Sequence, residues 1–128
     1  MEGAFSFGRN MNNRQNEAKA ERIQQRLDAG IVSVHFPEVA GIVISMIYNK
    51  KGIQSLLRTL NFYPSSAAFF RVDCLNNNCV DGGFDLTQVV TAMIGNRKEA
   101  AKGELSCEGN GLSANHSVIV YEVAIQYA

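Results

Sequence analysis

The feature that most constrains the fold is the apolar stretch Val39–Tyr48, the longest in the chain. With about ten residues it is half as long as a membrane-spanning helix, which needs about 20. A short apolar run that ends at polar residues and a glycine, as this one does at 49–52, is typical of a buried strand. The sequence therefore predicts that Val39–Tyr48 is a central strand of a sheet.

The segment 14–29, which precedes this strand, carries a helical pattern with little apolar surface. Ile23 and Leu27 lie on a narrow apolar stripe, and charged side chains occupy much of the remaining circumference. We expect a helix that docks peripherally or against a partner subunit. Arg22 and Arg26 are then part of a solvated face.

The other segments alternate between extended and helical patterns. We expect strands at 31–36, 39–48, 67–74, 103–107 and 117–127, and helices at 53–60 and 86–94, the latter with Asp85 as its N-cap. Residues 1–13, rich in Asn and Gly, predict a flexible leader, and residues 14–128 a single domain. Short connections and adjacent hairpins predict an α+β fold: a single antiparallel or mixed sheet of about five strands with two to three helices, mainly on one face.

The three cysteines of the chain and His116 all lie beside predicted turns. Cys74 and Cys79 have the spacing of a pair of zinc ligands. Cys107 and His116 flank the loop of the predicted terminal hairpin, where residues paired across the strands have Cβ atoms about 4.5–5.5 Å apart. Three thiolates and one imidazole form a tetrahedral zinc set. If strand 67–74 lies beside the terminal hairpin, these four residues predict a structural Cys₃His zinc site.

Other interpretations of the same residues stay open. Asp73, Asp81 or Glu108 can replace a missing ligand, and a site with only three protein ligands leaves room for an activated water. The thiols can also pack as small apolar side chains beside a surface histidine, or two of them can form a disulfide.

Composition limits the classes of partner. Twelve basic and twelve acidic residues cancel, so no net field attracts polyanions or anionic lipids. We therefore expect neither a nucleic-acid partner nor a membrane partner. Cysteines spaced like metal ligands favour the cytoplasm, where thiols stay reduced.

The leading hypothesis is a non-catalytic binding or regulatory module, stabilised by zinc, that contacts a protein partner or a second copy of itself. One alternative is a small hydrolase that uses an open zinc site or a cysteine nucleophile activated by His116. Another is a structural assembly subunit with inert thiols.

Overall fold

The computed structural model describes residues 6–50, 56–74, 82–108 and 117–128, with side chains left undescribed at 6–15 and 49–50. The helices are α1 (Ser6–Asp28), α2 (Val32–His35) and α3 (Thr87–Gly95). The strands are β1 (Val39–Lys50), β2 (Leu56–Phe62), β3 (Arg71–Val72), β4 (Phe84–Asp85), β5 (Ala100–Ser106) and β6 (Ser117–Tyr127).

Four strands form one antiparallel sheet in the order β2-β1-β6-β5, and β3 and β4 form a separate two-stranded ribbon. The α+β fold predicted from the sequence is therefore confirmed, with four strands in the main sheet. The predicted terminal hairpin is also confirmed, because β5 and β6 pair antiparallel from Ala100↔Ala124 to Ser106↔Val118. The stretch 39–48 lies in β1, which pairs with β2 on one side and β6 on the other.

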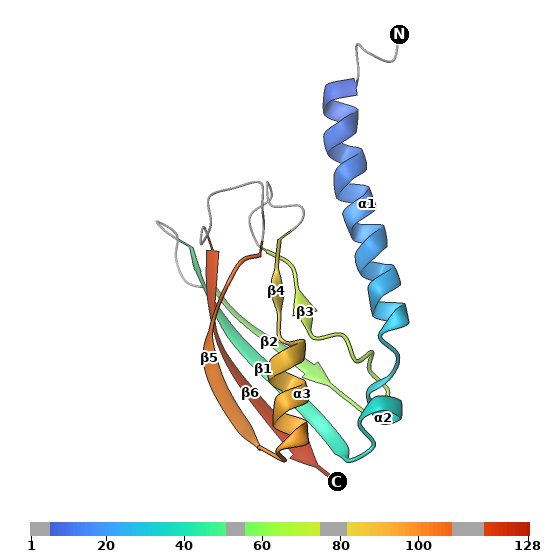
Figure 1. Cartoon of the computed structure of the whole chain (residues 1–128). Helices are drawn as coiled ribbons and strands as arrows, with labels where there is room; N and C mark the ends of the chain where they lie inside the picture. The colour runs from blue at the N-terminus through green and yellow to red at the C-terminus, as the bar shows by residue number, and fades with distance from the viewer. Residues whose placement is uncertain (1–5, 51–55, 75–81, 109–116) are drawn as a thin grey trace.

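The core lies on one face of the main sheet. Alternate residues of β1 and β6 point into it, as their period-two pattern requires, and α3 and the β3–β4 ribbon cover it (Figure 1). The buried side chains on this face include Ile42, Ile44, Met46 and Tyr48 of β1 and Ile119, Val123 and Ile125 of β6. From α3, Val90 and Met93 join the same cluster.

Helix α3 begins one residue later than the sequence predicted. The carboxylate of Asp85 accepts a hydrogen bond from the backbone N–H of Thr87 at 2.9 Å and another from the Thr87 hydroxyl. It thereby satisfies one of the backbone donors that a helix N-terminus leaves without an intrahelical partner. The N-cap predicted at Asp85 is nevertheless wrong by one residue, because Leu86 is the N-cap and its carbonyl accepts the first intrahelical bond, from Val90.

The opposite face of the main sheet is not covered by any described element, and we call it the open face. Leu57, Ile47 and Val120 lie in one cross-strand row on this face. Val43 and Ala124 lie in a second row, and the polar Ser45 and Glu122 lie between the two. The apolar stretch of β1 is therefore buried on one face only, although it is central in the sheet.

Helix α1 begins at Ser6 rather than Arg14, so residues 6–13, assigned above to a flexible leader, form its first turns. Figure 1 shows α1 beside the sheet and extending beyond it. Ile23 and Leu27 have 59% and 70% of their surface exposed. The apolar stripe is therefore not the docking face, and charged side chains hold the helix instead, as described below.

The predicted strand 31–36 was wrong. Residues 32–35 form the short helix α2, in which the Phe36 N–H donates to the Val32 carbonyl at 2.7 Å. Val32 is fully buried whereas Val34 is exposed, although both were expected on the same side. The reason is a tertiary contact: the N–H of Val32 donates to the Ser66 carbonyl, so this backbone packs against a turn rather than pairing with β1.

The predicted helix 53–60 was also wrong where the structure describes it. Leu56–Phe62 is strand β2, paired with β1 from Tyr48↔Leu56 to Ile42↔Phe62. Leucines at 56 and 60 fit a period of two as well as a helical period, and the edge of β1 selected the strand. In the predicted strand 67–74, all of it described, Arg71–Val72 forms β3, and Ala67 makes an isolated bridge with Ile31.

Candidate functional site

Two of the four predicted zinc ligands, Cys74 and Cys107, are described, while Cys79 and His116 lie outside the described residues. Cys107 directly follows β5 and is only 8% exposed, within the hydrophobic core. Cys74 is half-buried and packs against that core. The backbone N–H of Cys107 donates to the carbonyl of Ser117, the residue after His116, at 2.9 Å. The two ends of the terminal hairpin loop are therefore adjacent, as the site requires.

Two arginines connect the segments that carry the predicted ligands. Arg22 of α1 donates to the Asp73 carboxylate and to the Gly82 carbonyl, both at 3.2 Å. Arg71 of β3 donates to the Glu108 carboxylate at 2.7 Å and to the same Gly82 carbonyl at 3.4 Å. We call this set the arginine network. Its three acceptor residues are sequence neighbours of Cys74, Cys79 and Cys107, respectively.

Gly83 lets the backbone close this network. Its φ is +145°, and a Cβ at this position would lie 2.5 Å from the Val72 carbonyl oxygen. Glycine alone tolerates both the conformation and the close approach of β3. The Gly83 carbonyl then accepts the backbone N–H of Glu108 at 3.1 Å, so the segment after Cys79 is joined directly to the segment after Cys107.

The described part of the chain does not by itself contain a complete metal site. No three His, Cys, Asp or Glu side chains among residues 6–50, 56–74, 82–108 and 117–128 gather as metal ligands. The predicted set of Cys74, Cys79, Cys107 and His116 therefore stays a prediction. The neighbours that the structure describes meet at one end of the sheet, where β3, β4, β5 and β6 start or finish (Figure 1).

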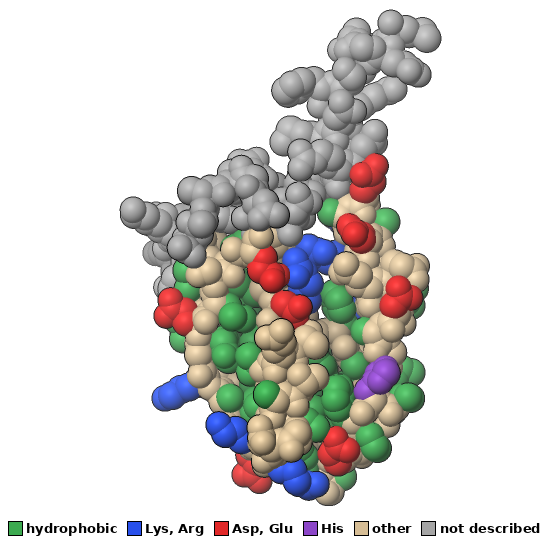
Figure 2. Space-filling model, viewed as in Figure 1, with side chains coloured by type: hydrophobic (Ala, Val, Ile, Leu, Met, Phe, Trp, Pro, Cys, Tyr) green, Lys and Arg blue, Asp and Glu red, His purple; other side chains and the backbone are tan. Residues whose placement is uncertain are grey.

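A second feature, which we call the arginine cleft, was missed from the sequence. It is a hollow of about 340 Å³ between α1, the edge strand β2 and the segment 66–73. Arg26, Arg58 and Arg71 line it together with Ser66 and Phe69. The guanidinium of Arg26 lies over the Phe69 ring, 5.6 Å from its centre. Figure 2 shows basic side chains (blue) gathered between α1 and the strands, with carboxylates (red) next to them.

No local signal in the sequence indicates this cleft. We assigned Arg26 to a solvated helix face and Arg58 to a helix, and Phe69 and Arg71 to a strand. The docking of α1 brings them together through contacts that span some fifty residues of chain, such as that between Arg22 and Asp73. Long-range ion pairs of this kind leave no periodic pattern that a reader of the sequence can detect.

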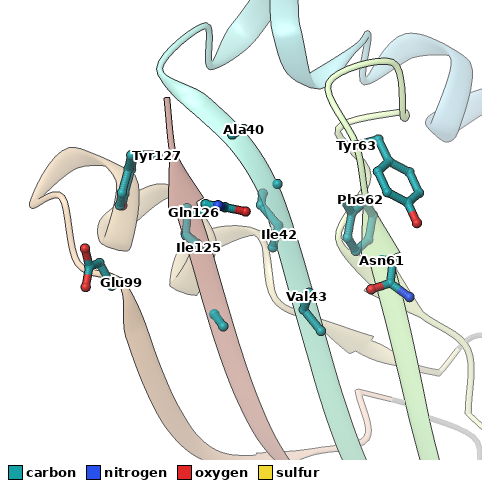
Figure 3. Close-up of a pocket in the computed structure, with 12 residues that line it drawn as sticks. Ala40, Ile42, Val43, Asn61, Phe62, Tyr63, Glu99, Ile125, Gln126 and Tyr127 are labelled. Carbon is teal, nitrogen blue, oxygen red and sulfur yellow. The ribbon is translucent and has the colours of Figure 1, made fainter.

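A further hollow, of about 620 Å³, lies at the end of the sheet around the irregular pairing between Val39 and Gly41. In Figure 3, Asn61 and Tyr63 lie at one side of it and Glu99 and Tyr127 at the other. These polar groups do not converge on a point, so the hollow lacks the few convergent polar groups that fix a ligand's orientation.

No helix in the described parts of the chain is long and apolar enough to cross a membrane. In comparisons with known proteins, no family model, no curated protein and no solved structure matches this chain.

Proposed function

We propose that the protein is a small non-catalytic binding or regulatory module, stabilised at one end of its sheet by zinc bound to Cys74, Cys79, Cys107 and His116. The arginine network supports this proposal. Through Arg22 and Arg71 it links Asp73, Gly82 and Glu108, and each of these residues is one to three positions from a proposed ligand. These described neighbours of the proposed ligands are thus linked without any metal.

The chemistry of the donor set fits zinc. Thiolates and a neutral imidazole are the ligands that Zn²⁺ prefers in structural sites. Two guanidinium groups, from Arg22 and Arg71, lie at the same end of the molecule. The thiolate is the form of cysteine that binds metal. When bound, the ion would cross-link the segments that follow β3 and β5.

The buried position of Cys107 favours a closed site over an open one. A nucleophilic cysteine, or a zinc ion that activates water, must be reached by substrate. With 8% of its surface exposed, Cys107 has little access to solvent. Between the two uses of a Cys–His set, the structural use agrees better with this burial than hydrolysis does.

For a partner we propose another protein or a second copy of this chain, in the cytoplasm, where the thiols would stay reduced. Ile23 and Leu27 on α1 are exposed, and so are Leu57 and Ile47 on the open face. Exposed apolar side chains that lie close together are typical of protein contact surfaces.

The test is elemental analysis of purified, untagged protein, followed by removal of the metal. We expect one zinc ion per chain. Either chelation or Cys107→Ser should lower the free energy of unfolding by at least about 2 kcal/mol, since the lost cross-link is a folding contribution. Ser106→Ala, at the exposed preceding residue, is the matched control and should leave both zinc content and stability unchanged.

The opposite result is equally clear. Native protein that contains no zinc, and whose three cysteines all react with a thiol reagent, would rule out the metal site. A zinc-containing protein that loses an assayable hydrolysis on chelation, with little loss of stability, would favour the open site of a hydrolase.

A further inference from the structure

The arginine cleft has an excess of positive charge that the described residues do not neutralise. Three cations, Arg26, Arg58 and Arg71, and one carboxylate, Asp73, line it. Asp73 is already paired with Arg22, and Arg71 is already paired with Glu108. With both partners included, four guanidinium groups face two carboxylates, which leaves two positive charges. A neutral chain has thus concentrated positive charge in one hollow.

The surplus belongs to two particular side chains. Arg58 makes no hydrogen bond or ion pair with any described residue, although it lies on the wall of the cleft. Arg26 rests on the Phe69 ring, which engages the flat face of its guanidinium and leaves the N–H groups at its edge for another acceptor. Donors in this state are available to a ligand.

Arg71 has an unsatisfied donor in addition. Its side chain is 16% exposed, and two of its nitrogens bond to Glu108 and Gly82. Its Nε is buried and has no hydrogen-bond partner in the described structure. Because a buried donor without an acceptor is unfavourable, most are satisfied in folded proteins. An oxyanion in the cleft would supply the acceptor if Arg71 turned its Nε toward the hollow.

We propose that the arginine cleft binds a small phosphorylated ligand through Arg26, Arg58 and Arg71. A phosphomonoester carries close to two negative charges near neutral pH and three acceptor oxygens, which match the surplus charge and the planar donors of arginine. Ser66 lines the same hollow and offers a hydroxyl.

The size and the walls of the cleft indicate what accompanies the phosphate. At about 340 Å³ the hollow is at the small end of the range for ligand sites, yet larger than a phosphate group needs. Leu60, Phe62 and Phe69 supply apolar and aromatic surface. The ligand class is therefore a phosphomonoester with one compact ring or apolar group, about the size of a mononucleotide. This goes beyond the zinc-stabilised module and uses none of the proposed metal ligands.

The experiment is titration of the purified full-length protein, with its metal content left as isolated, with inorganic phosphate and with adenosine 5′-monophosphate. Binding is followed by calorimetry and by two-dimensional ¹⁵N NMR that includes arginine Nε–H signals, and sodium chloride at matched ionic strength is the control. We expect saturable binding with a dissociation constant at or below about 1 mM for the monophosphate. The Nε–H signal of Arg71 should shift as the site fills.

Variants assign the binding to the cleft. Arg58→Ala and Arg26→Ala should each weaken binding by at least about tenfold, because each removes a charge-assisted contact. Lys102→Ala removes a cation from exposed strand β5 and should leave the dissociation constant unchanged. Arg58 makes no contact with the described structure through its charged group, so its substitution should not unfold the protein.

Three results would overturn the proposal. The first is that neither phosphate nor the monophosphate saturates the protein at a concentration ten times the expected dissociation constant. The second is equal affinity of the wild type and Arg58→Ala. The third is spectral change spread over the surface and reproduced by sodium chloride, which would mean general screening of charge.

Discussion

The half of the molecule built on β1, β6 and α3 and the half in which α1 docks on the segment after β3 are held together by different interactions. In the first half, alternate side chains of two central strands are buried against α3, and the contacts are apolar. In the second half, α1 leaves Ile23 and Leu27 exposed and docks through Arg22 to Asp73 and Gly82. Apolar burial is insensitive to salt, whereas partly exposed ion pairs weaken as salt screens them.

The two halves also differ in the hydrogen-bonding groups that they leave available to a ligand. The side chains of an apolar core carry no hydrogen-bonding groups, so packing against one another leaves nothing available to a ligand. A set of arginines held by few carboxylates leaves donors without acceptors, as Arg58 and the Nε of Arg71 show. The region with the weaker internal contacts is therefore the one with the greater capacity to bind.

The largest effect is expected from a substitution in the apolar half. Ile44→Ala, at a site 1% exposed in the middle of β1, should lower the free energy of unfolding by about 2–5 kcal/mol, because it leaves a cavity. Val43→Ala changes the next residue, on the open face and 38% exposed, and should lower it by less than about 1 kcal/mol. Urea unfolding of both variants measures the difference. Equal losses would show that the open face is buried in solution, for example by a second copy.

An intermediate effect is expected from a substitution that breaks the arginine network. Arg71→Ala should lower the free energy of unfolding by about 1–3 kcal/mol, since it removes a charge-assisted bond to Glu108 and a bond to Gly82. Arg58→Ala, the matched control, should change it by less than about 0.5 kcal/mol. The gap between the two variants should narrow in 1 M sodium chloride, because the Debye length falls to about 3 Å. A gap that is independent of salt would mean that Arg71 acts through packing of its stem.

The same division explains how much the sequence predicted. Val39–Tyr48 and Ser117–Tyr127 were placed correctly because a period-two or continuous apolar pattern is a local property that burial then enforces. The start of α3 was predicted to within one residue, with Asp85 instead of Leu86 as the N-cap, because the signals at a helix start are also local. The predicted strand 31–36 was wrong because its backbone bonds to Ser66, far along the chain. The predicted helix 53–60 was wrong where it is described because the edge of the neighbouring strand β1 selected a strand from a pattern that fits both periods.

The candidate sites divide in the same manner. Cysteine spacing drew attention to the segments around Cys74 and Cys107, and the structure brings their neighbours Asp73 and Glu108 into one network. The arginine cleft could not be predicted, since its three cations come from separate elements and meet only after α1 docks. The net charge of a chain does not determine where its charged side chains lie in the fold. A chain with no net charge can still form a strongly positive hollow.

The smallest expected effect concerns polar groups within the apolar half and compares two tyrosines. The hydroxyl of Tyr127 donates toward the Lys98 carbonyl at 2.7 Å and the Met93 carbonyl at 3.1 Å, which joins β6 to the end of α3. The hydroxyl of Tyr48 is buried without a hydrogen-bond partner in the described structure. Tyr127→Phe should therefore lower the free energy of unfolding by about 1 kcal/mol, and Tyr48→Phe should leave it unchanged or raise it slightly.

The pH dependence separates this hydrogen-bonding role from packing. Burial, with smaller contributions from Glu38 and Glu99 and against an opposing one from Arg97, raises the pKa of Tyr127 above its ordinary value of 10.0. The folded protein thus keeps this proton to a higher pH than the unfolded chain does. Its contribution is complete below pH 10 and is lost as pH rises through the raised pKa. The stability gap between wild type and Tyr127→Phe, measured by urea unfolding, should be constant from pH 7 to 9 and narrow above pH 10. A gap that stays constant to pH 11 would contradict the raised pKa of Tyr127. No gap at any pH would show that Tyr127 stabilises the protein through its ring alone, so that this half of the molecule is held by apolar contacts at this position too.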